Sequence, residues 1–155
     1  MASGWHTFMG REPYRYGIAI GETTYSYEVI KKGGVFGINF LPAERSELIQ
    51  AVGTFSGRDT DKFKEFGIEY ENGIKLDVPI LKDAYFAYEC KVSDIRKFGD
   101  HYWIVGDVLL TSKDEELFLK NRLPDFSKLS IPVHIGDSSY RVISDIVEEK
   151  DHPFN

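Results

Sequence analysis

The sequence lacks several features, and each absence excludes a class of protein. Cys90 is the single cysteine among 155 residues, so no disulfide can form within the chain. Lysines and arginines number 19 against 25 aspartates and glutamates, a net charge of -6, so we expect no nucleic-acid partner. No apolar run is long enough to span a bilayer, and the first residues do not resemble a secretory signal. We therefore expect a cytoplasmic protein with no membrane partner.

The spacings that mark common catalytic and metal sites are also missing. The histidines are scattered without a ligand-type spacing, so we predict no metal site. No nucleophile elbow, P-loop or dinucleotide fingerprint is present. Cys90 lies in an alternating apolar run, which indicates a buried, unreactive thiol rather than a nucleophile.

The chain does have a high aromatic content and alternating apolar patterns, both typical of β structure. Aromatic residues make up 14% of the chain, which suits a packed β core or contact with a flat ligand. From Ala84 the period is two, with Cys90 on one face and Glu89 on the other. Residues 93–100 are expected to join two strands as a hairpin. The predicted strands are 16–20, 35–40, 84–92, 102–111, 131–135 and 140–143.

Short helices are expected between these strands. The predicted helices are one from Thr23 or Thr24 to Gly33-Gly34, one over 44–55, one from Asp59 or Thr60 to Gly67, and one over 114–119. The pattern indicates a mainly β fold with short helices, arranged as a barrel that the helices decorate. We expect one domain over 1–146, followed by a polar tail at 147–155.

Two small-polar segments are candidate ligand sites. Thr23-Thr24-Tyr25-Ser26 lies at a helix start, where free backbone N–H groups suit a phosphate; the alternative, which the residues alone favour, is simple helix capping. Ser56-Gly57-Arg58-Asp59-Thr60, followed by Lys62, joins two helices and brings positive charge. This segment suits contact with the oxygen-bearing edge of a redox cofactor. The alternative is that it is only a solvent-exposed connection between the two helices.

Two further candidates are aromatic or titratable residues near strand ends. Gly99-Asp100-His101 precedes a long apolar strand, so His101 either contacts a ligand or serves as a turn residue. Trp5 either stacks on a planar ligand or closes one end of the barrel. Composition and periodicity leave both alternatives open.

The order of these motifs resembles the flavin reductase-like family, and in particular its flavoredoxin branch. The resemblance covers nearly the whole chain. The motifs that carry it are, in chain order, Ser3-x-Trp5-His6-Thr7, Thr24-Tyr25-Ser26, Gly37-Ile38-Asn39-Phe40, Ser56-Gly57-Arg58-Asp59-x-Asp61-Lys62-Phe63, Gly99-Asp100-His101 with Gly106, and Gly136-x-x-x-Tyr140. It implies a split β-barrel that binds FMN and forms a homodimer.

The resemblance also implies roles for the matching positions. The N-terminal motif would line the flavin, the helix start would hold the phosphate, and the third segment would hold the cofactor's other side. Asp100 and His101 would lie near the flavin ring or an incoming nicotinamide. The implied FMN-binding residues are Ser3, Gly4, Trp5, Thr24, Tyr25, Ser26, Ser56, Gly57, Arg58 and Lys62, and the implied catalytic residues are Asp100 and His101.

The implied function is an FMN-dependent oxidoreductase that takes electrons from NADH, NADPH or a redox protein partner. Gly99-Asp100-His101 favours an NAD(P)H:flavin reductase, whereas the segment from Ser56 to Phe63 favours a flavoredoxin-type electron carrier. The alternatives are a non-catalytic split-barrel binding module and a related barrel that binds haem or a pyridoxal-type phosphate. The family carries a further strand before the Ser-x-Trp motif, which here begins at Ser3. Either the chain is naturally short, or its start was placed at an internal Met, or an N-terminal piece is missing from this sequence; loss of the strand would expose a barrel edge.

Overall fold

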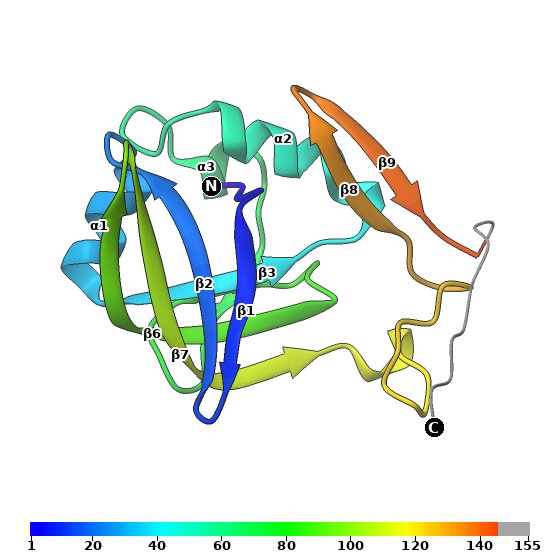
Figure 1. Ribbon diagram of the computed structural model, residues 1–155. Helices are drawn as coiled ribbons and strands as arrows, with labels where there is room; N and C mark the ends of the chain where they lie inside the picture. The colour runs from blue at the N-terminus through cyan, green and yellow to red at the C-terminus, as the bar shows by residue number, and fades with distance from the viewer. Residues whose placement is uncertain (146–155) are drawn as a thin grey trace.

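The protein, described from a computed structural model over residues 1–145, is built on one five-stranded antiparallel sheet of order β1-β2-β7-β6-β3 (Figure 1). Its strands are β1 His6–Arg11, β2 Tyr14–Gly21, β3 Val35–Phe40, β6 Phe86–Phe98 and β7 His101–Lys113. Two separate hairpins comprise β4 Tyr70–Asn72 with β5 Pro79–Leu81, and β8 Ile131–Gly136 with β9 Ser139–Ile143. The mainly β class is therefore confirmed, whereas the tail predicted at 147–155 lies outside the described residues.

The helices are short and lie around the sheet. They are α1 Tyr25–Gly33, α2 Ser46–Thr54 and α3 Lys62–Glu65, with single 3₁₀ turns at Ala43–Arg45 and Glu115–Leu117. The predicted helix over 44–55 is therefore a 3₁₀ turn followed by α2, and that over 114–119 is only a 3₁₀ turn. None of the helices described is long and apolar enough to cross a membrane.

Both caps of the first helix follow the sequence, whereas the N-cap of the third differs from the prediction. Thr24 is the N-cap of α1, and Gly34 ends it with a φ of 68° and an N–H that donates to Ile30 at 2.8 Å. The cap predicted at Asp59 or Thr60 is wrong, because Asp61 accepts from the backbone N–H of Lys64 and begins α3.

The core lies between the sheet and α1. Ile20, Cys90 and Ile104 are almost fully buried at its centre. Gly106 is required here, since a Cβ at this position would lie 2.7 Å from the Phe36 ring. The predicted unreactive thiol is confirmed as buried, and burial raises the pKa of Cys90 to about 12.

The alternation predicted for the strand after Ala84 is confirmed, and Glu89 shows that both faces of this strand are covered. Cys90 faces the core, and Glu89 on the opposite face is covered by the turn between β4 and β5, so both consecutive side chains are buried. The Glu89 carboxylate is 1% exposed and accepts three backbone N–H groups, each at 2.7 Å. These come from Ile74, Lys75 and Leu76, so Glu89 fixes the turn between β4 and β5.

Two expectations on the strands were wrong. The sequence predicted no strand at His6–Arg11, yet these residues form β1 at one edge of the sheet. Residues 93–100 were expected as a connection, but β6 continues to Phe98 and the turn contains only Gly99 and Asp100. Gly99 has a φ of 61°, which a two-residue hairpin turn favours.

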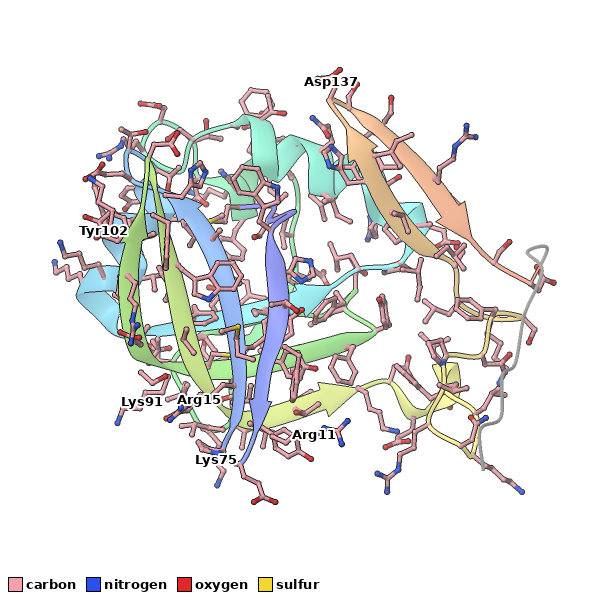
Figure 2. The ribbon with its side chains drawn as sticks, in the orientation of Figure 1. Arg11, Arg15, Lys75, Lys91, Tyr102 and Asp137 are labelled. Carbon is pink, nitrogen blue, oxygen red and sulfur yellow. The ribbon has the colours of Figure 1, made fainter. Side chains whose placement is uncertain are left out.

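The predicted β8–β9 hairpin is confirmed, and it stands apart from the main sheet beside α2 (Figure 1). Figure 2 shows Asp137 at its tip, directed away from the sheet. The Tyr140 hydroxyl donates to the Gln50 side chain at 3.0 Å, which fastens the hairpin to α2. One wall of a cleft is thereby formed.

Candidate functional site

A cleft of about 690 Å³ lies between the edge strands of the sheet, α2 and the β8–β9 hairpin. Ser3 and Gly4 line it from the N-terminal segment, and Lys62 lines it from α3. None of the cleft-lining residues in the described part of the chain is an aspartate or a glutamate. Such a cleft suits a ligand that carries acceptor oxygens or negative charge.

The N-terminus of α1 presents backbone donors. The Thr24 hydroxyl accepts from the Tyr27 N–H at 3.3 Å and donates to the Gly21 carbonyl at 2.9 Å. The first N–H groups of a helix have no intrahelical acceptor, so those of Tyr25 and Ser26 are available to a ligand. Together with the helix dipole, they suit a phosphate group.

The hairpin turn between β6 and β7 lies against this helix start. His101 pairs with Gly21 across the strands, and the Asp100 carbonyl accepts the Glu22 N–H at 3.0 Å. The Asp100 carboxylate lies 2.8 Å from Nδ1 of His101, and this hydrogen bond lowers the pKa of Asp100. An ionised carboxylate only accepts, so the bond places a proton on Nδ1 and directs Nε2 elsewhere.

Trp5 joins this group from the N-terminal segment. Its ring centroid lies 4.9 Å from that of His101, and the Trp5 carbonyl accepts the Ala19 N–H at 2.8 Å. The Trp5 residue is 64% exposed. A large aromatic surface is therefore open beside an imidazole, as contact with a flat ligand requires.

The segment from Ser56 to Arg58 packs on the other side of the helix start. A Cβ on Gly57 would lie 2.9 Å from the Tyr25 ring, so glycine is needed for this approach. The Ser56 hydroxyl accepts the Arg58 N–H at 3.2 Å. The Arg58 guanidinium lies over the Tyr25 ring and forms an ion pair with Glu28, so its charge is already balanced.

Lys62 is the cation whose charge is left for a ligand. Its Nζ donates to the Val52 carbonyl at 2.6 Å, and burial lowers the pKa of Lys62. Among the residues that the structure describes, it has no carboxylate partner. Of the predicted cations, Lys62 is therefore better placed than Arg58 to meet an anionic group in the cleft.

The predicted site residues thus form two adjoining groups. The larger, which we call the rim cluster, comprises Trp5, Thr24, Tyr25, Ser26, Ser56, Gly57, Arg58, Asp100 and His101. The smaller comprises Ser3, Gly4 and Lys62, which line the cleft itself. The Ser3 hydroxyl donates to the Trp5 carbonyl at 3.4 Å and connects the two groups. A phosphate at the helix start and a ring system in the cleft fit this arrangement.

Sequence reasoning missed His6, which also lines the cleft. His6 belongs to the N-terminal motif Ser3-x-Trp5-His6-Thr7, but no role for it is predicted from the sequence. The signal that could have found it is its position beside Trp5, a predicted ligand contact. Its partner, the Tyr16 hydroxyl 2.6 Å from Nδ1, comes from β2 and could not be inferred from spacing.

Comparison with known proteins gives a family match and distant relatives. The model of the flavin reductase like domain matches residues 1–125. An uncharacterised protein of Pyrococcus abyssi is 31% identical over 145 residues, covering 94% of this chain and 82% of that protein. A protein of Agrobacterium fabrum named FMN reductase (NADH) RutF is 25% identical over 108 residues, covering 68% of this chain and 60% of its own length.

Solved structures resemble the whole fold. The FMN-binding protein from Thermus thermophilus with bound 1-cyclohex-2-enone has a TM-score of 0.85 and 27% identity, covering 97% of this chain and 80% of that chain. The flavoredoxin from Methanosarcina acetivorans has a TM-score of 0.83 and 25% identity, covering 96% and 79% respectively. The expected split-barrel fold is confirmed by these likenesses.

Proposed function

The chain belongs to the flavin reductase-like family, and on that premise we propose that it binds FMN and transfers electrons through it. The observation that carries the proposal is the junction of the rim cluster with a cleft of about 690 Å³ to which residues 1–145 contribute no carboxylate. When bound, the flavin would supply the chemistry of accepting a hydride and passing electrons onward. The protein would contribute position and electrostatics, from one domain over 1–146.

In this proposal the α1 N-terminus holds the phosphate. The N–H groups of Tyr25 and Ser26 and the dipole of the nine-residue helix favour an anion. Ser56 and Gly57 would border the same group, while Ser3, Gly4 and Lys62 would contact the remaining cofactor. Lys62 would stabilise negative charge on the reduced ring.

His101 and Asp100 would meet the electron donor. Asp100 accepts a hydrogen bond from Nδ1 of His101, which leaves Nε2 to face a ligand beside the exposed Trp5 ring. The named activity of the Agrobacterium relative supports a nicotinamide donor, and the flavoredoxin-like structure supports a carrier fed by a protein partner. We favour the reductase, because the Asp100–His101 pair stands at the rim where a second ring can approach.

We also propose that the active form is a cytoplasmic homodimer. The outer face of the sheet carries a depression of about 550 Å³ in which the apolar side chains of Met9, Phe98, Trp103 and Val105 lie beside Arg15, Ser93, Asp94 and Arg96. Phe98 is 63% exposed and pairs with His101 of the rim cluster, and Met9 on β1 is 47% exposed. A second copy covering this face would remove apolar surface from water and enclose the flavin site.

The test is FMN binding by Ser26→Asp. A carboxylate at the helix start repels the phosphate, so we expect FMN affinity to fall at least about tenfold in a fluorescence titration. Ser46→Asp, at the start of α2, adds the same charge away from the rim cluster and is the control. Equal affinities for Ser26→Asp and the parent protein would remove the phosphate from α1.

A further inference from the structure

His6 and Tyr16 form a polar pair in a largely aromatic part of the cleft. His6 begins β1 and lines the cleft, and its Nδ1 lies 2.6 Å from the Tyr16 hydroxyl on β2. The Tyr16 ring packs against Tyr88 with centroids 5.1 Å apart, and Tyr16 is 6% exposed. The phenol therefore belongs to the core, whereas the imidazole forms part of the cleft surface.

The pair determines which imidazole nitrogen carries the proton. Burial raises the pKa of Tyr16 to about 12, so the phenol keeps its proton near neutral pH. Burial lowers the pKa of His6, which keeps the imidazole neutral. Within residues 1–145 the His6 ring is the hydroxyl's one hydrogen-bond partner, so the phenol donates to Nδ1. The remaining proton must lie on Nε2, which has no partner in that part of the chain.

The walls around this N–H favour a flat ligand. The Phe40 ring stands edge-on to His6 with centroids 5.9 Å apart, and the Tyr85 ring lies 6.4 Å from Phe40. Both line the cleft, and the described part of the cleft contributes no carboxylate that would compete for the proton. An unpaired donor beside aromatic rings that line the same cleft is best matched by an acceptor oxygen on a planar molecule.

We propose that His6 determines substrate specificity by donating its Nε2 hydrogen to the carbonyl oxygen of a planar unsaturated compound. Tyr16 is the positioning residue that holds His6 in this tautomer. The inference rests on the proposed function and names a substrate class for the same cleft, in which the carbonyl compound would lie beside the flavin. An aromatic aldehyde or a conjugated ketone has the required shape and acceptor.

The tautomer is tested first, by ¹⁵N-detected NMR of the histidine rings in the protein without added cofactor. We expect His6 to show the Nε2–H form at neutral pH and Tyr16→Phe to show a mixture of both forms, because the fixed donor is lost. Benzaldehyde should shift the Nε2 signal of His6 in the parent protein. A His6 ring protonated on Nδ1, or a signal that benzaldehyde leaves unmoved, would overturn the proposal.

Specificity is tested with two ligands of similar shape, benzaldehyde and styrene, of which only benzaldehyde carries an oxygen. With FMN-loaded protein, the perturbation of the flavin spectrum measures each affinity. We expect the parent to prefer benzaldehyde by about fivefold, the worth of one hydrogen bond, and His6→Phe to lose this preference. His134→Phe is the matched control, because His134 lines the cleft but its Nε2 already contacts the Asp137 carbonyl at 3.0 Å.

The two hypotheses fail in different ways. A parent protein that takes up no FMN contradicts the proposed function, while the NMR measurement still decides the role of His6. Normal FMN affinity with the same ligand preference in parent and His6→Phe contradicts the specificity role alone. Normal FMN affinity in His6→Phe with the preference lost supports it, since a merely structural histidine would not distinguish the two ligands.

Discussion

Glu89 shows how one buried carboxylate can organise a loop. Its two oxygens accept the N–H groups of Ile74, Lys75 and Leu76, and the residue is 1% exposed. Glu89→Ala would leave these three donors without their acceptor, so we expect the free energy of unfolding to fall by about 3 kcal/mol or more. Urea denaturation followed by circular dichroism measures the change.

The control for this prediction is Glu69→Ala. The Glu69 side chain is 74% exposed and its ion pair with Lys82 lies on the surface, so its removal should change stability by less than about 0.5 kcal/mol. Similar losses for the two variants would mean that Glu89 does not fix the loop.

His6 predicts a pH dependence of stability. Burial holds the pKa of His6 below its ordinary value, so the unfolded chain binds this proton first as the pH falls. The associated stability is therefore present above about pH 6.5 and is lost as the pH falls through the lower pKa of the folded state. We expect unfolding free energies measured from pH 7.5 to 5 to fall more steeply for the parent than for His6→Phe. Parallel curves would contradict this.

At the scale of elements, the structure shows which of two adjacent threonines caps α1, a choice that the sequence alone left open. The Thr24 side chain caps the helix, whereas Thr23 is exposed in the preceding turn. We expect Thr24→Ala to reduce stability by about 1 kcal/mol and Thr23→Ala to have little effect. Thermal unfolding of the two variants measures the difference, and a greater loss for Thr23→Ala would show that the helix begins differently.

The elements also show where prediction from sequence ends. α1 and β3 follow from local signals, a capping threonine, a terminal glycine and an apolar run, so their positions could be predicted. The burial of Glu89 could not, because its carboxylate is covered by N–H groups contributed by a separate turn. β1 was missed because most of its residues are exposed, which removes the alternation that marks a half-buried strand.

Some features of the candidate site could likewise be predicted from the sequence, and others could not. Motif order indicated the residues of the rim cluster, and the fold brings them together at the start of α1. The ion pair between Arg58 and Glu28 links α1 to a separate loop, so a preference for Lys62 over Arg58 could not be predicted from spacing. The contact between His6 and Tyr16 likewise depends on the pairing of β1 with β2.

At the scale of the whole molecule, the proposed dimer predicts that the outer sheet face is covered in solution. Phe98→Glu replaces an exposed aromatic ring on this face with a carboxylate, so we expect sedimentation equilibrium to show a shift from dimer towards monomer. Ile74→Glu is the control, since Ile74 is 80% exposed and lies at the turn between β4 and β5. A parent protein that sediments as a monomer would contradict the proposal directly.

The central claim is that the cleft and its rim hold FMN, and a visible absorbance spectrum tests it most directly. The purified protein is mixed with FMN, freed of excess by gel filtration, and then treated anaerobically with NADH or NADPH. We predict a flavin spectrum that travels with the protein and is bleached by a nicotinamide. Bound flavin that resists both donors would contradict the reductase and leave the electron carrier, whereas a colourless protein would contradict FMN binding and favour a non-catalytic barrel.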